Sequence, residues 1–436
     1  MEKFKYHRIH DLIPGGCHTY SRGDDQFPVN APPLLARGSG CYVWDEKGNK
    51  YLDYGMGLRS VTVGYANQRI NQAAIDQINN GNNLTRASTV EFQAAEKFLS
   101  IIDNSDMVKF AKNGSNVTTA AVKLARSYTG RKYILRCTDQ PFFSFDDWFI
   151  GDTVIKKGIP SEVSSLTLGF NYNDIDSVEK ILTDERYKND IAAVILEPVN
   201  VVEPKSFGQE NFLEYLRRRT DEMCIVLIFD EIVTGFRLHE KGVQAKYNVK
   251  PDLSTFGKAM ANGFSLAALC GRKPIMELGG IRKEQDERTF LLSSTYGSEM
   301  SSYGAFLETC KVYDEYNVVQ HLNSYGKKLK SEMNKISKSL GIQEYFYVDG
   351  FDASPYYVTK GLDGQNSYAL RTVFNEKMIE NSVMMPWMAF SLSHGEDEIE
   401  KTLIAVEDSL KEYQRCLEGV DLKSGHIIKP VFRKFN

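Results

Sequence analysis

Short apolar runs bounded by polar turns alternate with helical stretches through the middle of the chain. Three of these runs are almost wholly apolar: residues 133–136 (YILR), 192–198 (AAVILEP) and 225–231 (IVLIFDE). Strands that are buried on both faces have this composition, because helices cover both sides of a parallel sheet. The pattern therefore predicts an α/β fold with a mostly parallel sheet.

Amphipathic stretches around these runs predict the helices. From Asn67 onward, apolar residues recur at helical spacing until Gly81, and the expected buried face consists of Ile70, Ala74, Ile75 and Ile78. Earlier in the chain, residues 40–55 (GCYVWDEKGNKYLDYG) have the pattern of two aromatic-rich strands joined by a turn at Lys47, Gly48 and Asn49. Further helices are expected over residues 117–128, 327–340 and 397–417.

The character of the sequence changes near residue 317, where charged amphipathic helices surround short strand-like pieces such as residues 344–350 (EYFYVDG). A chain of 436 residues has room for roughly three domains or fewer. We expect an N-terminal segment, 1–66, that joins a small domain. A large domain, 67–316, and a C-terminal small α+β domain, 317–436, complete the expected organisation.

Composition and charge exclude several classes of protein. The chain has 53 Lys and Arg against 57 Asp and Glu, and a net charge of −4 gives no electrostatic footprint for nucleic-acid binding. Its 42% hydrophobic and 25% charged residues are ordinary for a globular protein. The longest apolar runs are too short to cross a bilayer, and residues 1–16 lack the apolar stretch of a secretory signal.

The cysteines and histidines argue against disulfides and metal. The seven cysteines are scattered without close pairs, which is typical of reduced thiols in a cytoplasmic protein. The seven histidines are equally dispersed, so no metal site is expected. We expect a cytoplasmic protein whose partners include neither nucleic acid nor membrane.

A carboxylate is expected where a buried strand ends. Asp230 and Glu231 close the apolar run 225–231. Burying a carboxylate without a partner is costly or forces it to protonate. A cation is therefore expected beside Asp230, either a side chain or a ligand nitrogen. A helix cap or a structural salt bridge would explain the same two residues.

Lys258 lies 28 residues further on, between Gly257 and Ala259 in PDLSTFGKAMANG. Small neighbours leave room for a flat ligand, and a lysine with a lowered pKa can form a Schiff base. Taken alone, a lysine in such a pair is more often a surface residue.

Asn113, Gly114, Ser115 and Asn116 precede the helix expected from residue 117. Backbone N–H groups at a helix start form an anion site, although Ser and Asn also favour an ordinary N-cap. The segment is neither a P-loop nor the three-glycine dinucleotide fingerprint. Together, the candidate residues around 115, 230 and 258 require a ligand with a phosphate, a basic ring nitrogen and an aldehyde. Pyridoxal 5'-phosphate has all three.

The chain resembles the class III pyridoxal-phosphate-dependent aminotransferases, and within them it is similar to the glutamate-1-semialdehyde 2,1-aminomutases. The similarity runs over nearly the whole chain and is most specific in FDEIVTGFR (229–237) and PDLSTFGKAMANG (251–263). It implies the PLP-dependent transferase fold type I, with a mostly parallel seven-stranded sheet in the large PLP-binding domain and a smaller α+β domain. It also implies a homodimer with shared active sites.

The resemblance implies a role for each matching residue. Lys258 would form the Schiff base, and Asp230 would hold the pyridinium nitrogen. Arg22 matches the position that holds the substrate carboxylate. The other cofactor contacts that it implies are Gly114, Ser115 and Asn116 at the phosphate, Ile232 and Phe142 on the two ring faces, and Thr295 reaching the phosphate from the neighbouring subunit.

The sequence departs from the family on the substrate side. Phe142-Phe143-Ser144 replaces Tyr-His-Gly, so Phe142 can still stack on the ring, and a core role for one or both phenylalanines is the alternative. Leu58-Arg59-Ser60 replaces Trp-Gly-Pro, which makes Arg59 a second anion-binding residue or a plain salt-bridge partner. Two further departures are Val202 in place of an asparagine, and Glu299-Met300 in place of Asn-Pro.

The expected function is the transfer of an amino group between an amino donor and an aldehyde or ketone acceptor that is small or sugar-derived and anionic. The reaction would follow a ping-pong Schiff-base mechanism. The aminomutase is the alternative, because re-amination of the same molecule at a neighbouring carbon needs the same residues. A non-catalytic PLP-binding protein is a remote alternative, and the missing glycine fingerprint disfavours a nicotinamide dehydrogenase.

Overall fold

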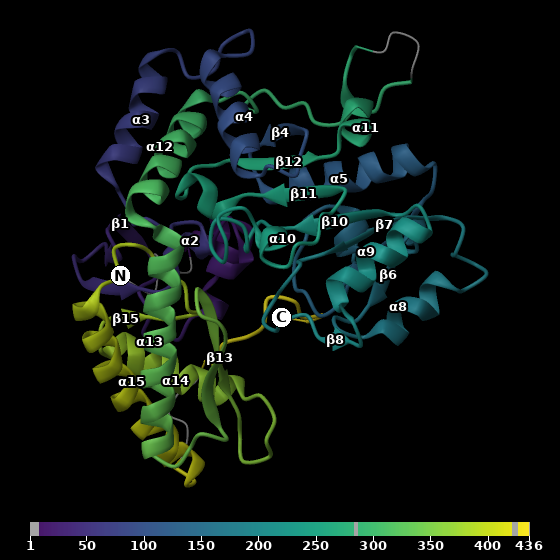
Figure 1. The fold of residues 1–436 in the computed structure, drawn as a ribbon. Coiled ribbons are helices and arrows are strands. Elements are labelled where there is room, and N and C mark those ends of the chain that lie inside the picture. The colour runs from purple at the N-terminus through teal and green to yellow at the C-terminus, as the bar shows by residue number, and fades with distance from the viewer. Residues whose placement is uncertain (1–7, 283–286, 421–425, 436) are drawn as a thin grey trace. The chain divides into compact units, whose positions relative to one another are not determined.

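The computed structural model describes residues 8–282, 287–420 and 426–435 (Figure 1). The chain forms two compact units, one of Met1–Asn67 with Tyr316–Val431 and the other of Gln68–Glu315 with Phe432–Asn436. The domain boundaries expected after residues 66 and 316 stay a prediction, because compactness does not establish that a part of the chain folds alone.

The unit of Gln68–Glu315 is built on a seven-stranded sheet of order β4-β12-β11-β10-β7-β5-β6. β12 runs antiparallel to both of its neighbours, and the other neighbouring pairs are parallel. The expected mostly parallel seven-stranded sheet is therefore confirmed. Its strands are β4 (Met107–Ala111), β5 (Tyr133–Cys137), β6 (Thr167–Phe170), β7 (Ile191–Leu196), β10 (Val226–Asp230), β11 (Leu253–Phe256) and β12 (Ala267–Gly271).

The three apolar runs are β5, β7 and β10, and they are almost wholly apolar because both faces of the sheet are covered (Figure 1). Ile228 of β10 faces a core that includes α5 (Gly114–Thr129). Its neighbour Phe229 faces the opposite core, which includes α8 (Ile175–Leu182) and α9 (Phe212–Glu222). Successive residues of one strand thus enter two different cores.

The helix expected from Asn67 is α3 (Gln68–Asn79). Ile70 and Ala74 are buried as expected, but Ile75 and Ile78 are 44% and 52% exposed, so the predicted buried face is wrong for those two. The other helices of this unit are α4 (Thr89–Ile101), α6 (Asp147–Ile150), α7 (Ser161–Ser164), α10 (Val243–Lys246), α11 (Lys273–Met276), the 3-10 turns η4 (Lys258–Ala261) and η5 (Glu277–Gly279), and α12 (Met300–Tyr316), beside a short ribbon of β8 (Ser206–Phe207) and β9 (Glu210–Asn211).

The other unit contains a four-stranded sheet of order β1-β2-β3-β15 and a hairpin of β13 and β14. The predicted hairpin is confirmed as β2 and β3, which pair antiparallel around Gly48 with φ +88°. Helix α15 begins at Glu396, one residue before its expected start. Helix α13 begins at Val318, well before its expected start at residue 327. The elements are η1 (Pro14–Gly16), η2 (Tyr20–Arg22), η3 (Asp24–Gln26), β1 (Leu35–Ser39), β2 (Tyr42–Asp45), β3 (Lys50–Asp53), α2 (Met56–Arg59), α13 (Val318–Ser339), β13 (Phe346–Phe351), β14 (Ser354–Thr359), α14 (Tyr368–Glu380), β15 (Val383–Met384) and α15 (Glu396–Leu417).

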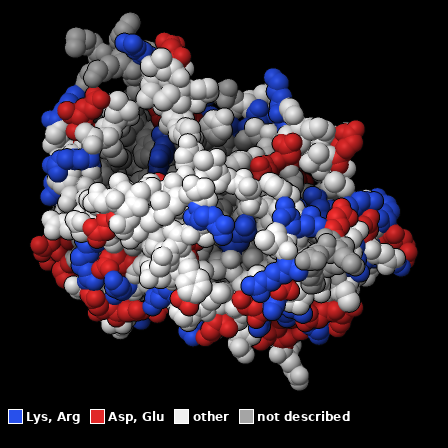
Figure 2. Space-filling model, turned by 90° about the horizontal axis from the view of Figure 1, so that it is seen from above, with Lys and Arg blue, Asp and Glu red and all other residues white. Residues whose placement is uncertain are grey.

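The surface carries charges of both signs. On the face seen in Figure 2, Lys and Arg side chains intermingle with Asp and Glu side chains. Within the described residues, no helix is long and apolar enough to cross a membrane, and no three His, Cys, Asp or Glu side chains gather as metal ligands would.

Gly326 on α13 offers a test of the packing. A Cβ at this position would overlap the backbone oxygen of Asp352, which cannot move without displacing the connection between β13 and β14. Gly326→Ala should lower the free energy of unfolding by about 1–3 kcal/mol, because overpacking forces the backbone to shift. Denaturant unfolding measures the change. Ser324→Ala, exposed on the same helix, is the control, and equal stability of the two variants would contradict the packing described.

Candidate functional site

Asp230 is the last residue of β10 and is 3% exposed. Its Oδ1 accepts hydrogen bonds from the Ile232 amide at 3.0 Å and from the Thr255 hydroxyl at 3.1 Å. Thr255 reaches it because the parallel register of β10 and β11 places the two residues side by side. Both donors bind Oδ1, so within the described residues Oδ2 receives no hydrogen bond and is available to a further donor.

Burial raises the pKa of Asp230 to about 6, against the lowering effects of the Ile232 amide, the Lys258 charge and the Thr255 hydroxyl. The sequence predicts a cation beside this carboxylate, and Lys258 supplies positive charge there. A second cationic donor at Oδ2 would favour the ionised carboxylate further.

Lys258 follows β11 after a single glycine and begins η4. Its φ is +43°, a conformation that is strained for a residue with a side chain. The side chain is partly exposed. A Cβ at Gly257 would lie 3.6 Å from Cγ2 of Ile232, so the segment that carries the lysine packs against this isoleucine.

The start of α5 lies against the same isoleucine. A Cβ at Gly114 would lie 2.5 Å from Cδ1 of Ile232, closer than real Cβ contacts come. Glycine therefore permits this approach, whereas a Cβ here would displace the end of the Ile232 side chain. Ile232 contacts both the beginning of α5 and the Gly257–Lys258 segment, and so three segments far apart in the sequence meet around one side chain next to Asp230.

Asn113 is the N-cap of α5, since its side chain accepts a hydrogen bond from the Asn116 amide at 3.0 Å. The N-cap interpretation is thus correct for Asn113, and it occupies the Asn116 amide. The first N–H groups of a helix, here those of Gly114 and Ser115, have no acceptor within it. The Ser115 hydroxyl accepts from the Phe145 amide at 3.1 Å and can still donate its own hydrogen.

The loop after β5 is attached to the first turn of α5. The Thr118 hydroxyl donates to the backbone oxygen of Phe143 at 2.8 Å, and the Phe143 side chain is 1% exposed in the core. Phe142 is 45% exposed, with its ring centroid 5.7 Å from that of Phe149. Of the two phenylalanines, Phe142 is thus the one accessible to a ligand, and its stacking on a ring stays a prediction.

The hydrogen bonds of two further buried polar residues, Gln140 and Glu231, were not predicted from the sequence. The Gln140 side chain is 1% exposed. It donates to the backbone oxygen of Glu197 at 2.7 Å and accepts from the backbone amide of the same residue at 2.8 Å, which ties the ends of β5 and β7 together. Glu231 accepts from the Val243 and Gln244 amides at 2.9 and 2.8 Å, and burial raises its pKa to about 7. The only signal in the sequence was the position of each residue after an apolar run.

Lys112 links the segment before the N-cap to the loop that carries Thr295. Its ammonium lies 2.6 Å from the Glu299 carboxylate, which also accepts a hydrogen bond from Nδ2 of the Asn82 side chain at 3.3 Å. The Asn83 side chain donates to the backbone oxygen of Thr295 at 3.1 Å. The departure at residue 299 thus creates an ion pair next to the start of α5. Thr295 is exposed, and its role toward a neighbouring subunit stays a prediction.

The two arginines expected at the substrate belong to the other unit. Arg22 ends η2, and Arg59 ends α2. The four residues of α2 have φ values of 39°, 57°, 60° and 68°, so they form one turn of left-handed helix. Each non-glycine residue costs roughly 1–2 kcal/mol in that conformation. The sequence did not signal this turn, because Leu58 and Arg59 disfavour positive φ.

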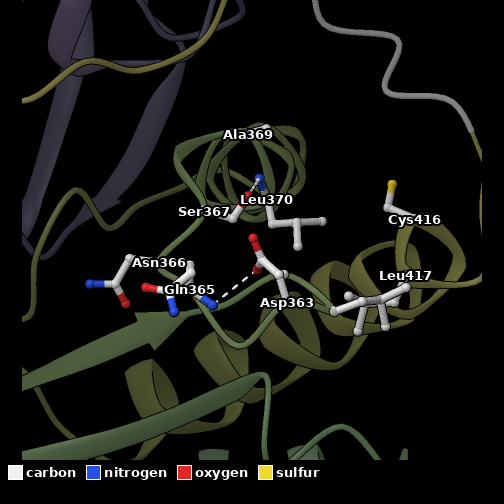
Figure 3. Close-up of a pocket in the computed structure, with 10 residues that line it drawn as sticks. Asp363, Gln365, Asn366, Ser367, Ala369, Leu370, Cys416 and Leu417 are labelled. Atoms are coloured by element: carbon white, nitrogen blue, oxygen red, sulfur yellow. Dashed lines mark hydrogen bonds between the residues drawn. The ribbon is translucent and has the colours of Figure 1, made fainter.

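That unit also carries a hollow of about 380 Å³ on its surface, whose lining includes Asp363, Gln365, Ser367, Leu370 and Cys416 (Figure 3). The Asp363 carboxylate accepts from the Gln365 amide at 3.0 Å, so it is engaged in its own turn. None of the predicted site residues lines this hollow.

Comparisons with known proteins identify the family of the chain. The sequence model of the family "Aminotransferase class-III" matches residues 20–344. The chain is 30% identical over 413 residues to 3-aminobutyryl-CoA aminotransferase of Cloacimonas acidaminovorans, covering 93% of this chain and 95% of that protein. It is 30% identical over 419 residues to glutamate-1-semialdehyde 2,1-aminomutase of Archaeoglobus fulgidus, with 92% and 97% covered. The PLP-bound FumI protein of Sphingopyxis sp. MTA144 superposes with a TM-score of 0.85 at 25% identity, covering 96% and 98%.

The raised pKa of Asp230 predicts a pH dependence of stability in the ligand-free protein. Because the folded pKa of about 6 exceeds the unfolded value of about 3.9, the folded state holds more protons between these pH values, and stability is lost as pH rises through them. The difference in the free energy of unfolding between Asp230→Asn and the wild type should therefore change by about 3 kcal/mol in favour of the variant as the pH rises from 3 to 7.

Unfolding midpoints across this pH range measure the effect. The control is Asp184→Asn, because Arg186 lowers the pKa of the partly exposed Asp184 and the change should have the opposite sign. A difference between Asp230→Asn and the wild type that does not vary with pH would contradict the account of Asp230.

The close contact of Gly114 with Ile232 predicts a coupling between the two positions. Gly114→Ala should destabilise the ligand-free protein by about 0.5–1.5 kcal/mol, because the new Cβ pushes Cδ1 of Ile232 away from its preferred rotamer. Ile232→Val removes that atom, so Gly114→Ala should cost clearly less when it is combined with Ile232→Val. A double-mutant cycle of unfolding free energies gives the coupling, and strictly additive effects would show that the contact is absent.

Proposed function

We propose a specific reaction for this chain, which belongs to the class-III aminotransferases and is a pyridoxal-phosphate-dependent enzyme. In this proposal it moves an amino group from an amino donor to a small or sugar-derived aldehyde or ketone that carries an anionic group. Family membership rests on the match over residues 20–344 and on relatives 30% identical over more than nine tenths of the chain.

The arrangement around Ile232 is the observation that carries the proposal. A phosphate suits the N–H groups and hydroxyl at Gly114 and Ser115, a ring nitrogen suits the available Oδ2 of Asp230, and an aldehyde suits the Lys258 amine. Gly114, and Gly257 next to Lys258, both approach the side chain of Ile232, which lies two residues after Asp230. When bound, the cofactor supplies an exchangeable aldehyde and an electron-accepting ring.

Each residue then has a distinct task. Asp230 holds a proton on the ring nitrogen, and its own raised pKa falls again when this cation is in place. With the cofactor bound, Nζ of Lys258 would attach it and would move the proton at the donor carbon. Ile232 and Phe142 cover the two ring faces and exclude water. The Asn116 side chain completes the phosphate contacts.

The substrate side and the assembly are part of the same proposal. Arg22 binds a substrate carboxylate, and Arg59 adds a second positive charge. The enzyme is a cytoplasmic homodimer in which Thr295 serves the partner's phosphate site. Exposed apolar side chains support an interface, since Ile78 on α3 and Tyr296 next to Thr295 are 52% and 67% exposed.

An aminomutase is the second candidate, favoured by the extended similarity to proteins of that name. It would use the same residues but would need no external amino donor, because the amino group returns to the same molecule. The departures at residues 58–60, 202 and 299–300 weigh against it, since they fall on the side of the substrate.

Lys258→Ala tests the proposal most simply. The variant should lose turnover by at least roughly 10²–10⁴-fold and should lose the visible absorption band of the bound cofactor, because the amine that attaches the cofactor and moves the proton is gone. Borohydride reduction followed by peptide mapping should place the cofactor of the wild type on Lys258. Lys123→Ala, a surface change on α5, is the control. Undiminished steady-state activity in Lys258→Ala would refute the assignment.

A further inference from the structure

Glu231 is a fully buried carboxylate that the proposed reaction does not use. It follows Asp230 directly, and within the described part of the chain no Lys or Arg side chain pairs with it. Burial raises its pKa to about 7, whereas its hydrogen-bond donors lower it. A carboxylate away from water is costly unless hydrogen bonds satisfy it. Neutral donors thus take the place of a cation here.

These donors come from both ends of the loop that connects β10 with α10, residues 231–242. Near the start of the loop, the Thr234 hydroxyl donates to Oε2 of Glu231. Just beyond its end, the Val243 amide donates to Oε2 at 2.9 Å and the Gln244 amide to Oε1 at 2.8 Å. One carboxylate therefore closes the whole loop.

The geometry requires a carboxylate at residue 231. Its contacts are with N–H and O–H donors, and an ionised carboxylate offers only acceptors, whereas a glutamine would offer one oxygen and an NH2 group that faces another donor. The fit is also close, because Gly242 has a φ of +79° and a Cβ there would lie 2.7 Å from Oε1. Glu231→Gln therefore keeps the size of the side chain but breaks part of the closure.

The 231–242 loop contacts the candidate site through Ile232. A Cβ at Gly114 would lie 2.5 Å from this side chain, and a Cβ at Gly257 would lie 3.6 Å from it. The Ile232 amide also donates to Asp230 at 3.0 Å. The course of the loop therefore determines the place of the isoleucine and of one donor to the Asp230 carboxylate.

The same loop packs against the strand that leads to Lys258. The Gly235 amide donates to the backbone oxygen of Glu231 at 2.8 Å, and a Cβ at Gly235 would lie 2.5 Å from Cδ1 of Phe256. Phe256 is fully buried and ends β11, directly before Gly257 and Lys258. One closed loop therefore contacts both the isoleucine and the segment that carries the lysine.

We propose that Glu231 is a positioning residue of the cofactor site. Its carboxylate closes the 231–242 loop, and the loop holds Ile232 against the ring and the end of β11 in the place that Lys258 needs. A cap that only stabilises the loop is the competing interpretation. The inference rests on the proposed function, which assigns Ile232 and Lys258 to the cofactor.

Glu231→Gln and Asp252→Asn separate positioning from stability. Asp252 is the matched control, because it is 3% exposed and pairs with Arg217 and Arg272. It precedes β11, at the opposite end of that strand from Lys258. Both variants leave buried donors without a full partner, so each should lower the thermal midpoint of the ligand-free protein by about 3–10 °C.

Affinity for pyridoxal 5'-phosphate distinguishes the two roles. Titration of the visible band of the bound cofactor measures it, at a temperature where circular dichroism shows every variant folded. Glu231→Gln should bind the cofactor about 10- to 100-fold more weakly, the usual effect of removing a group that orients a binding residue. The pH midpoint of the band, which depends on the surroundings of the Lys258 amine, should move by about one unit. Asp252→Asn should change neither quantity.

Thr234→Val gives a milder test that does not depend on the folding of Glu231→Gln. It removes one donor, keeps the shape of a side chain that is 2% exposed, and leaves the carboxylate in place. Binding of the cofactor should weaken by about 3- to 10-fold. Thr220→Val is its control, since Thr220 is 1% exposed and its hydroxyl donates to backbone oxygens of α9.

Two results would overturn the inference. One is a Glu231→Gln or Thr234→Val variant that loses stability but keeps the affinity and the pH midpoint of the wild type, which would leave Glu231 a cap of the loop. The other is an equal loss of affinity in Asp252→Asn or Thr220→Val, which would make the effect one of general destabilisation. Failure of the proposed function looks different, because the wild type itself would then show no visible band with pyridoxal 5'-phosphate. That result would remove the inference together with the function.

Discussion

The site depends on one carboxylate that is buried without a full set of partners. Asp230 stands where β10 leaves the centre of the sheet, with two donors on Oδ1 and none among the described residues on Oδ2. In a medium of low dielectric constant this arrangement raises its pKa to about 6. A cationic ligand nitrogen would complete the set, and the neighbouring Lys258 and α5 start offer the other groups that such a ligand needs. The parallel sheet provides this position, because the carboxyl ends of its strands meet at one edge.

The sequence predicted the elements that place these residues, because buried strands and amphipathic helices leave clear patterns. The runs 133–136, 192–198 and 225–231 are strands of one sheet, and α5 follows its N-cap as expected. The patterns failed for Ile75 and Ile78, whose exposure leaves part of the predicted face of α3 in contact with solvent in a single chain. Apolar periodicity predicts that one face of a helix is covered, but it does not show which part of the molecule covers it.

Side-chain partners that depend on register or on local backbone could not be predicted in the same way. Thr255 donates to Asp230 only because β10 and β11 pair with those two residues side by side. The assignment of Phe143 to the core and of Phe142 to the surface follows from the course of one loop. The left-handed turn at Met56–Arg59 leaves no trace in composition, since two of its residues disfavour that conformation. Strain of this kind is visible only in the structure, and both Lys258 and Arg59 carry it.

A crystal structure of the protein loaded with pyridoxal 5'-phosphate tests the central claim most directly. The account predicts that Oδ2 of Asp230 lies about 3 Å from the ring nitrogen, that Nζ of Lys258 is bonded to the cofactor, and that Ile232 lies against a ring face. A cofactor bound elsewhere, or an Asp230 carboxylate with no contact to the ring nitrogen, would contradict it.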